Sequence, residues 1–141
     1  MNPTFVLDAS LTLSWAFEDE ATPFTDEVLA RLKHTSALAP ALWPFEIASV
    51  LSTAERQGRI QPDQQTEFLE WLRQLPVAIE HRPTTWVCQQ ILPLTRAYRL
   101  SAYDAAYLEL ARREGLPLAT LDGDLQTAAR AHGVALLETS V

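Results

Sequence analysis

The sequence predicts an α/β protein, a three-layer α/β/α sandwich around a central, mostly parallel sheet of about four to five short strands. Short apolar runs alternate along the chain with longer segments of helical periodicity, which is the pattern of strands joined by crossover helices. Apolar residues make up 48% of the 141 residues, enough for one hydrophobic core. With only four glycines and no low-complexity tract, we expect a single domain over residues 1–141.

In the first half of the chain, each expected element has its own local signal. The β-branched and apolar run at 4–7 is typical of a buried strand, and Asp8 follows it at once. Gly58 ends a long apolar-periodic segment, as expected just beyond a helix C-terminus. The elements expected here are strand 4–7, helix 11–17, helix 22–34, a weak strand 37–40 and helix 43–57.

The second half continues the alternation. Pro62 and Asp63 favour a helix start, Gly115 a helix end, and Asp122 the cap of a short helix reaching His132. The elements expected are helix 62–74, strand 77–81, helix 84–98, helix 101–113, strand 116–121, the helix after Asp122 and a last short strand 134–137.

Charge and cysteine content exclude several classes of protein. The single cysteine, Cys88, rules out an internal disulfide framework and a cysteine-rich zinc site. A net charge of −7 argues against a uniformly basic nucleic-acid surface, although the ten arginines leave room for local basic patches. The beginning of the sequence lacks a secretory pattern and no apolar run is long enough to span a bilayer, so we expect a cytoplasmic protein that does not insert into membranes.

Four carboxylates are expected to meet at one edge of the sheet. Asp8 and Asp122 directly follow predicted strands, while Glu46 and Asp104 lie in the first turns of predicted helices. In an open parallel sheet, right-handed crossovers place strand C-termini and the N-termini of the following helices on the same edge. Four acids from distant segments would then converge.

Helical periodicity suggests that two of these acids point inward. At about 100° per residue, Asp104 shares a face with the apolar residues Tyr107 and Leu108, and Glu46 shares one with Val50. An inward carboxylate is costly unless it is hydrogen-bonded, paired or bound to metal. Oxygen ligands alone favour Mg²⁺ or Mn²⁺, and bound magnesium is suited to assisting phosphodiester hydrolysis.

Each acid also has a simpler structural interpretation. Ser101 and Asp104 fit the S-x-x-D capping box, and Asp8 and Asp122 are both suited to cap helices. Glu46 is compatible with an exposed first-turn acid favoured by the helix dipole. The four acids together, rather than any one of them, indicate a metal site.

The stretches FVLDAS, PALWPFEIASVL, LSAYDAAYLELA and LPLATLDGDL together resemble the PIN-domain nucleases, in particular the VapC toxins of toxin–antitoxin pairs, over essentially the whole chain. The resemblance implies a Mg²⁺-dependent endoribonuclease, with Mn²⁺ able to substitute, that acts on RNA, is neutralised by a cognate VapB-like antitoxin and is usually a homodimer.

The resemblance also assigns roles to individual residues. Asp8, Glu46, Asp104 and Asp122 match the family's acidic quartet, which binds the metal and is catalytic. Possible auxiliary residues are Ser10, Thr120 and Asp124, the last as a supplement to Asp122 or its replacement. Ser49 stands where the family often has asparagine, three residues after the glutamate.

Two other functions are compatible with parts of the pattern. A haloacid-dehalogenase-type phosphatase also places an aspartate after its first strand, but Ser10 replaces its second aspartate and Lys33, the only lysine, is no good candidate for its catalytic lysine. A degenerate PIN fold acting only as a binding module is the non-enzymatic alternative, and the presence of all four acids argues against it.

Overall fold

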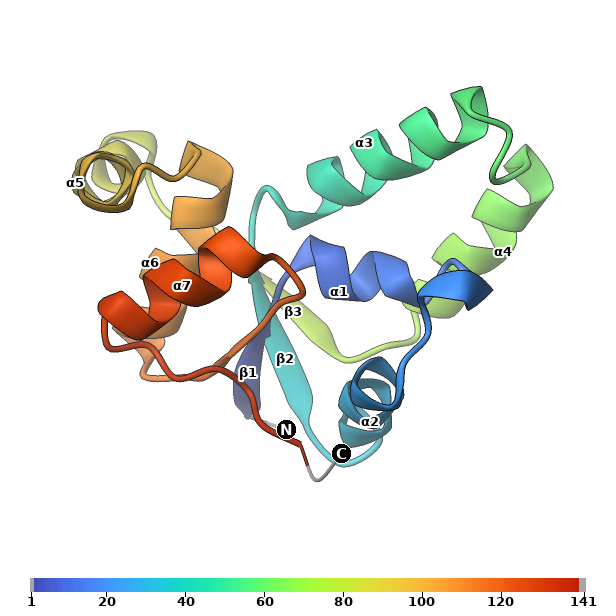
Figure 1. Cartoon of the computed structure of the whole chain (residues 1–141), viewed down its shortest axis with the longest axis horizontal. Helices are drawn as coiled ribbons and strands as arrows, with labels where there is room; N and C mark the ends of the chain where they lie inside the picture. Colours follow the sequence, from blue (N-terminus) through green and yellow to red (C-terminus); the bar gives the residue numbers. More distant parts are fainter. Residues whose placement is uncertain (1, 140–141) are drawn as a thin grey trace.

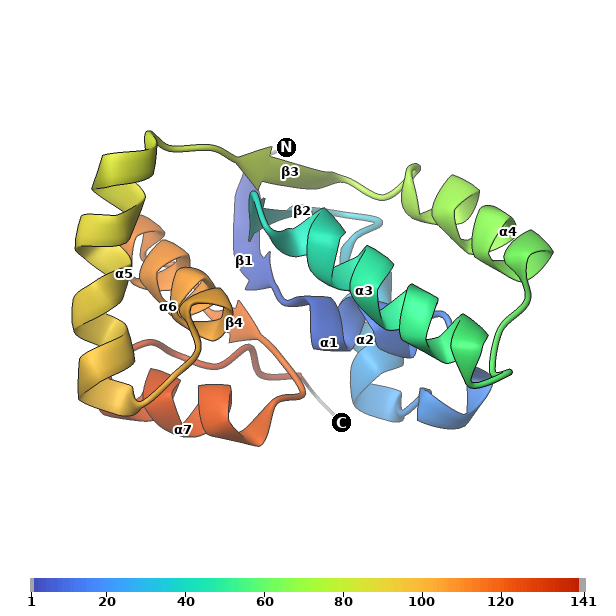
Figure 2. The same cartoon turned by 90° about the horizontal axis from the view of Figure 1, so that it is seen from above.

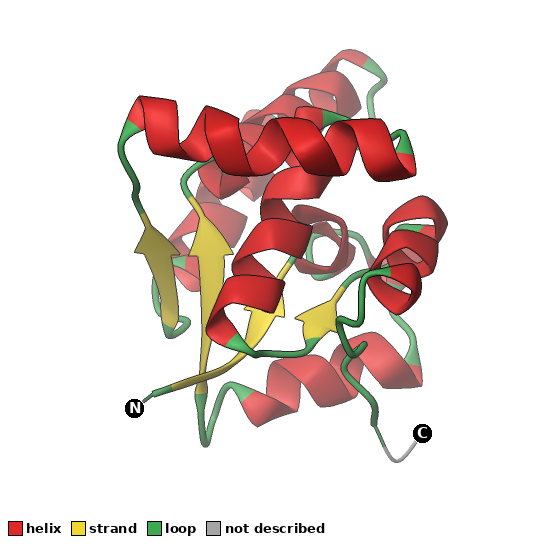
Figure 3. Cartoon of the chain, turned by 90° about the vertical axis from the view of Figure 1, so that its left-hand side faces the viewer, coloured by secondary structure: helices red, strands yellow, loops and turns green. Residues whose placement is uncertain are grey.

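The computed structural model describes residues 2–139. Its centre is a four-stranded sheet in the order β3-β2-β1-β4, with every pairing parallel (Figure 3). The strands are β1 (Pro3–Leu7), β2 (Ser36–Pro40), β3 (Val77–Glu80) and β4 (Leu118–Ala119). This confirms the predicted α/β sandwich with a parallel sheet.

Helices cover both faces of the sheet. Figure 2 shows α1 to α4 on one side of the strands and α5 to α7 on the other, and Figure 1 shows the same elements from the side. The helices are α1 (Ala9–Ser14), α2 (Pro23–Arg31), α3 (Trp43–Arg56), α4 (Pro62–Leu72), α5 (Thr84–Tyr98), α6 (Ala102–Glu114) and α7 (Gly123–Ala131), with a 3₁₀ turn η1 (Glu18–Glu20).

The core is built from strands that are apolar on both faces. Phe5, Val6 and Leu7 of β1 are fully buried, as expected for a central parallel strand with helices above and below. On α6, Tyr107 and Leu108 are also fully buried, and this helix contacts β1, β2 and β4. The position of α6 across the sheet brings its N-terminal turn towards the end of β1.

The strand order creates a switch point beside β1. From β1 the chain moves outward to β2 and then β3, before the α5–α6 connection returns it to β4 on the other side of β1. Ligands of open α/β sheets bind outside the carboxyl ends of the strands at such a point. The residues that follow β1 and β4 are therefore the ones best placed to form a site.

Some predicted elements differ from the structure. The predicted strand 116–121 is reduced to β4, which begins only after Pro117, a residue without an N–H to donate to a sheet. The predicted last strand at 134–137 is wrong: its only ladder pairing is one isolated bridge between Leu136 and Leu118. Two hydrogen bonds, Leu118 N to Ala135 O and Leu137 N to Leu118 O, both 2.9 Å, hold this segment beside β4.

The first predicted helix also moves. It begins at Ala9 rather than at residue 11, because Asp8 caps it, and it ends at Ser14 instead of residue 17. The other predicted helices agree with the structure to within about three residues, the usual uncertainty of helix ends. None of the helices among residues 2–139 is both long and apolar enough to cross a membrane.

Candidate metal and active site

Asp8 is held in place by both of its carboxylate oxygens. It follows β1, caps α1 and is only 4% exposed. One oxygen accepts from the backbone N–H of Ser10, and the other accepts from the hydroxyl of Thr120, which follows β4. Burial raises the pKa of Asp8, its hydrogen bonds oppose this, and the Asp122 carboxylate adds to the rise. The end of β1 therefore presents a fixed carboxylate.

The loop after β4 is joined to the beginning of α1 by hydroxyl groups. Ser10 Oγ accepts from the backbone N–H of Leu121 at 3.1 Å, and Thr120 Oγ1 accepts from that of Asp122 at 3.0 Å. One oxygen of Asp122 then caps α7 by accepting from the N–H groups of Asp124 at 2.9 Å and Leu125 at 3.1 Å. The capping interpretation of Asp122 is thus correct, and its other oxygen is not engaged in these bonds.

Glu46 lies in the first turn of α3, half-buried, and is oriented by a residue of α6. The Tyr107 hydroxyl donates to Glu46 Oε1 at 2.6 Å. The pKa of Glu46 is raised by burial and by the carboxylates of Asp8 and Asp122, while the Tyr107 hydrogen bond lowers it. The expected apolar face shared with Val50 is wrong, because Val50 is 43% exposed. Glu46 faces the other acids because α3 begins at the carboxyl edge of the sheet.

Asp104 lies in the first turn of α6 and is partly exposed rather than fully buried. The Ser101 hydroxyl caps this helix by accepting from the Asp104 N–H at 3.1 Å. The pKa of Asp104 is raised to about 6, first by burial and then by the charges of Asp122, Asp8, Glu46 and Asp124. The expected S-x-x-D cap is present through the serine hydroxyl, and the aspartate carboxylate interacts through its charge with the other acids.

The structure thus brings together the four acids that the sequence singled out. Their mutual charge repulsion links residues from the ends of β1 and β4 and from the starts of α3 and α6. Asp124 joins the cluster at its edge, exposed in the first turn of α7. Carboxylates crowded in this way are best stabilised in their charged form by a cation.

The carboxylate oxygens of the cluster are ligands that suit a hard cation, and the distance between the acids limits how such an ion would be held. Within residues 2–139, no three His, Cys, Asp or Glu side chains lie close enough together to hold an ion directly. Mg²⁺ usually keeps several water molecules and is bound through one or two carboxylates together with substrate phosphates. All-oxygen donors at this spacing therefore fit a hydrated magnesium ion, and not a structural zinc site enclosed by protein ligands.

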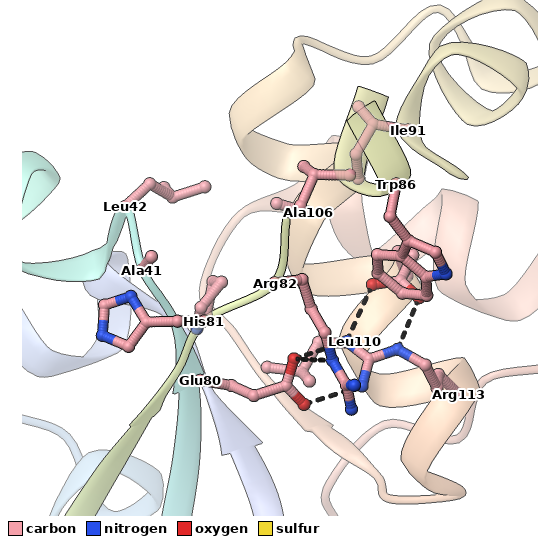
Figure 4. Close-up of a pocket in the computed structure, with 13 residues that line it drawn as sticks. Ala41, Leu42, Glu80, His81, Arg82, Trp86, Ile91, Ala106, Leu110 and Arg113 are labelled. Carbon is pink, nitrogen blue, oxygen red and sulfur yellow. Dashed lines mark hydrogen bonds and ion pairs between the residues drawn. The ribbon is translucent and has the colours of Figure 1, made fainter. Parts of the chain in front are cut away.

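Two open grooves adjoin the acids. A cleft of about 430 Å³ is lined by Asp104, Asp124 and Arg99, and a groove of about 290 Å³ is lined by Glu46 and by the exposed aromatic rings of Phe45 and Tyr103. A third cavity, of about 220 Å³, lies between the end of β3, α5 and α6 and is lined by none of the four acids (Figure 4). The grooves beside the acids are the ones relevant to a substrate.

Sequence reasoning missed the role of Tyr107. This tyrosine was recognised only as an apolar neighbour of Asp104, yet its hydroxyl fixes Glu46, a residue 61 positions away. The signal was present in the sequence, since a buried tyrosine usually finds a partner for its hydroxyl. The sequence did not show which residue this partner is, because Glu46 belongs to another helix. Thr120, expected as an auxiliary residue, does contact Asp8.

Comparison with known proteins identifies the family of this chain. The profile of the family described as "PIN domain" matches residues 5–131. The chain therefore belongs to the PIN-domain family. The matched range includes all four acids and the residues that follow β1 and β4.

The relatives narrow this to one branch. The chain is 35% identical over 105 residues to Ribonuclease VapC3 of Mycobacterium tuberculosis, covering 72% of this chain and 71% of that protein. It is 28% identical over 122 residues to Ribonuclease VapC3 of Pyrobaculum aerophilum, covering 85% of this chain and 90% of that protein. These similarities place it among the VapC members of the family.

Solved structures support the fold. PAE2754 from Pyrobaculum aerophilum superposes with a TM-score of 0.69 at 20% identity, covering 91% of this chain and 86% of that one. A toxin–antitoxin complex from Klebsiella pneumoniae gives a TM-score of 0.56 at 15% identity, covering 84% and 87%. At these identities the likeness shows the shared fold alone.

Proposed function

We propose that this protein is a Mg²⁺-dependent endoribonuclease that hydrolyses RNA phosphodiester bonds. The observation that carries the proposal is the acid cluster: burial of Asp104, and after it the charges of the neighbouring acids, raise the pKa of Asp104 to about 6. A bound cation would stabilise the ionised form of acids that are buried and crowded in this way. The similarity to two proteins named Ribonuclease VapC3 supports RNA as the substrate.

In this proposal Asp8, Glu46, Asp104 and Asp122 would hold a hydrated metal ion, directly or through its water molecules, and Mn²⁺ would be able to replace Mg²⁺. When bound, the ion supplies Lewis acidity towards the scissile phosphate and lowers the pKa of an attacking water.

The chain's own side chains orient the carboxylates. The Thr120 hydroxyl holds Asp8 and the Tyr107 hydroxyl holds Glu46, so neither acid has to be ordered when a substrate arrives. Ser10 fixes the loop that carries Asp122. No lysine or histidine is among these four acids, so a proton that moves during the reaction would be held by one of their carboxylates or by metal-bound water.

Partners follow from the same assignment. The fold resembles a protein solved in a toxin–antitoxin complex, which supports a VapB-like antitoxin as the inhibitor of this chain. The exposed rings of Phe45, 77% exposed, and Tyr103, 61% exposed, beside the site support an apolar contact with a second copy. Light scattering tests the homodimer, since a monomer mass for the wild type would contradict it.

We place the activity of this protein in the cytoplasm, where the protein would meet cellular RNA.

Cleavage of structured RNAs tests the proposed activity. We expect cutting with Mg²⁺ or Mn²⁺, none with EDTA, and at least a 100-fold loss of rate in Asp8→Asn and Asp104→Asn, as is typical when a group that stabilises the transition state is removed. Asp63→Asn is the matched control, because Asp63 is an exposed first-turn acid of α4 remote from the cluster. Cleavage that continues without metal, or full activity in both cluster variants, contradicts the mechanism. If the unmodified protein cut no RNA at all, the result would favour the alternative of a degenerate PIN fold that acts only as a binding module.

A further inference from the structure

The turn between α5 and α6 contains an arginine in an unfavourable backbone conformation. Arg99 has φ 54° and ψ 38°, in the left-handed region. Three further residues within 2–139 have positive φ, and all three are glycines: Gly58, Gly115 and Gly133. Glycine is the usual residue where a helix ends in this conformation, since a Cβ is crowded there. The fold accepts strain at Arg99 that glycine would remove.

Arg99 is one of the residues that line the cleft beside the acids. The same cleft of about 430 Å³ is lined by Asp104 of α6 and Asp124 of α7. Arg99 is exposed, and the ion pairs among residues 2–139 involve Arg59, Arg73, Arg82 and Arg113 but not Arg99. Its guanidinium is therefore not neutralising the acid cluster directly, and its five N–H donors remain available to a ligand.

The charge of the cleft indicates which ligand this is. RNA approaching the acids meets repulsion from a protein with net charge −7 and from the cluster itself. A guanidinium at the rim offsets this repulsion and binds a phosphate through two parallel hydrogen bonds. Backbone strain retained at such a position is typical of a residue kept for what its side chain does.

We propose that Arg99 binds a backbone phosphate of the RNA substrate, next to the phosphate that is cleaved. This inference rests on the proposed ribonuclease function and deepens it by naming how the strand is held. Arg99 is a substrate-binding residue here, and the carboxylates retain the chemistry. Its contact with a phosphate does not depend on the base sequence.

Three variants separate the possible roles of Arg99. Arg99→Gly removes the side chain and relieves the strain; Arg99→Lys keeps the charge and the strain but loses the planar fork. Arg130→Ala is the matched control, because Arg130 is an exposed arginine at the end of α7 that does not line the cleft. Binding of a fluorescent single-stranded RNA of mixed sequence is measured by anisotropy in an Asp8→Asn background, which blocks cleavage, at several salt concentrations.

For Arg99→Gly we expect a melting temperature no lower than that of the parent protein, an RNA affinity roughly tenfold weaker, and a slope of log K against log[salt] smaller by about 0.7, the value for one phosphate contact on a single strand. Arg99→Lys should keep the slope of the parent protein, because the charge is retained, but should bind RNA more weakly than the parent. In the cleavage assay, with Asp8 intact, KM rises in Arg99→Gly while kcat changes little.

Two results would overturn the inference while the ribonuclease proposal stands. One is an Arg99→Gly variant that binds and cleaves RNA as the parent does; the other is an equal loss in Arg99→Gly and Arg130→Ala, which would indicate a general effect of charge. An unmodified protein that neither binds nor cleaves RNA would instead overturn both proposals.

Discussion

At the scale of single residues, the site is a balance between burial and charge. Asp8 is buried but accepts hydrogen bonds at both carboxylate oxygens. Burial, and after it the charges of the neighbouring acids, raise the pKa of Asp104 to about 6. In the folded protein without metal, the ionised form of Asp104 is therefore destabilising, whereas a simple capping aspartate would be neutral or stabilising.

Asp104→Asn should stabilise the metal-free protein at neutral pH. The folded pKa of Asp104 lies above its ordinary value of 3.8, so the wild type loses stability as pH rises from about 3.8 through about 6. Above that window we expect the variant to be more stable by about 1 to 2 kcal/mol, less than the full pKa difference gives because solvent screens a partly exposed group.

Urea unfolding in EDTA measures this difference at a series of pH values. The two proteins should converge below pH 3.8, where Asp104 is protonated in both states. A variant less stable than the wild type at pH 8 would show that Asp104 serves the helix cap and not the acid cluster.

At the scale of elements, an ion-pair network fastens α6 to the edge strand. Arg113 of α6 contacts Glu80 at the end of β3 with N–O distances of 2.7 and 2.8 Å, and Glu109 one turn earlier at 2.8 Å (Figure 4). Trp86 of α5 lies over the guanidinium, 4.9 Å from the Arg113 Cζ to the ring centroid. These contacts fix α6, which carries both Asp104 and Tyr107, against the sheet.

Arg113→Met should destabilise the protein in a pH-dependent way. The hydrogen bonds from Arg113 are the main cause of the lowered pKa of Glu80. Their contribution is therefore present above the ordinary Glu80 pKa of 4.5 and is lost as pH falls through the lower folded value. We expect a cost of about 1 to 2 kcal/mol at pH 7, since the pair is partly buried and Arg82 still reaches Glu80.

The matched control for this network is Arg73→Met. Arg73 pairs with Glu70 at 2.8 Å, but both side chains are more than half exposed, so the change should cost at most about 0.5 kcal/mol. Thermal melts at pH 7 and at pH 3 compare the two variants. An Arg113→Met deficit that persists undiminished at pH 3 would show that packing, rather than the ion pairs, accounts for the loss.

At the scale of the whole molecule, the topology makes the acid cluster. β1 and β4 are neighbours in the sheet although more than a hundred residues separate Asp8 from Thr120, whose hydroxyl contacts it. The helices that carry Glu46 and Asp104 lie on opposite sides of the sheet. Repulsion among the acids therefore lowers the stability of the whole folded molecule, and a bound cation would reduce this repulsion.

Magnesium should stabilise the whole molecule by binding the folded state only. We expect the melting temperature to rise with Mg²⁺ concentration, corresponding to roughly 2.7 kcal/mol at a hundredfold excess over Kd. Asp8→Asn should lose most of the rise, whereas Asp63→Asn, outside the cluster, should keep it. Equal rises in all three proteins would point to a nonspecific salt effect, and chelation by EDTA should reverse a specific one.

The sequence by itself determined the fold class, most of the elements and the four acids. These rest on local signals: apolar strands, first-turn prolines, capping residues and acids directly after strands or at helix starts. The predicted strand at 134–137 was wrong. This segment makes a single bridge, from Leu136 to Leu118 of β4, and the extent of such pairing depends on the neighbouring strand and not on the local pattern. Nor could periodicity show that Val50, one turn after Glu46, is 43% exposed.

Only the tertiary structure decided how the acids are held. The Tyr107 hydroxyl meets Glu46 and the Thr120 hydroxyl meets Asp8 across helices and strands that are distant in the sequence. The strain at Arg99 and its place beside Asp104 likewise depend on how α5 and α6 are joined and packed. Local sequence sets the propensity of an element, but contacts between elements arise from packing of the complete chain, and these contacts set the pKa values and orientations on which the chemistry depends.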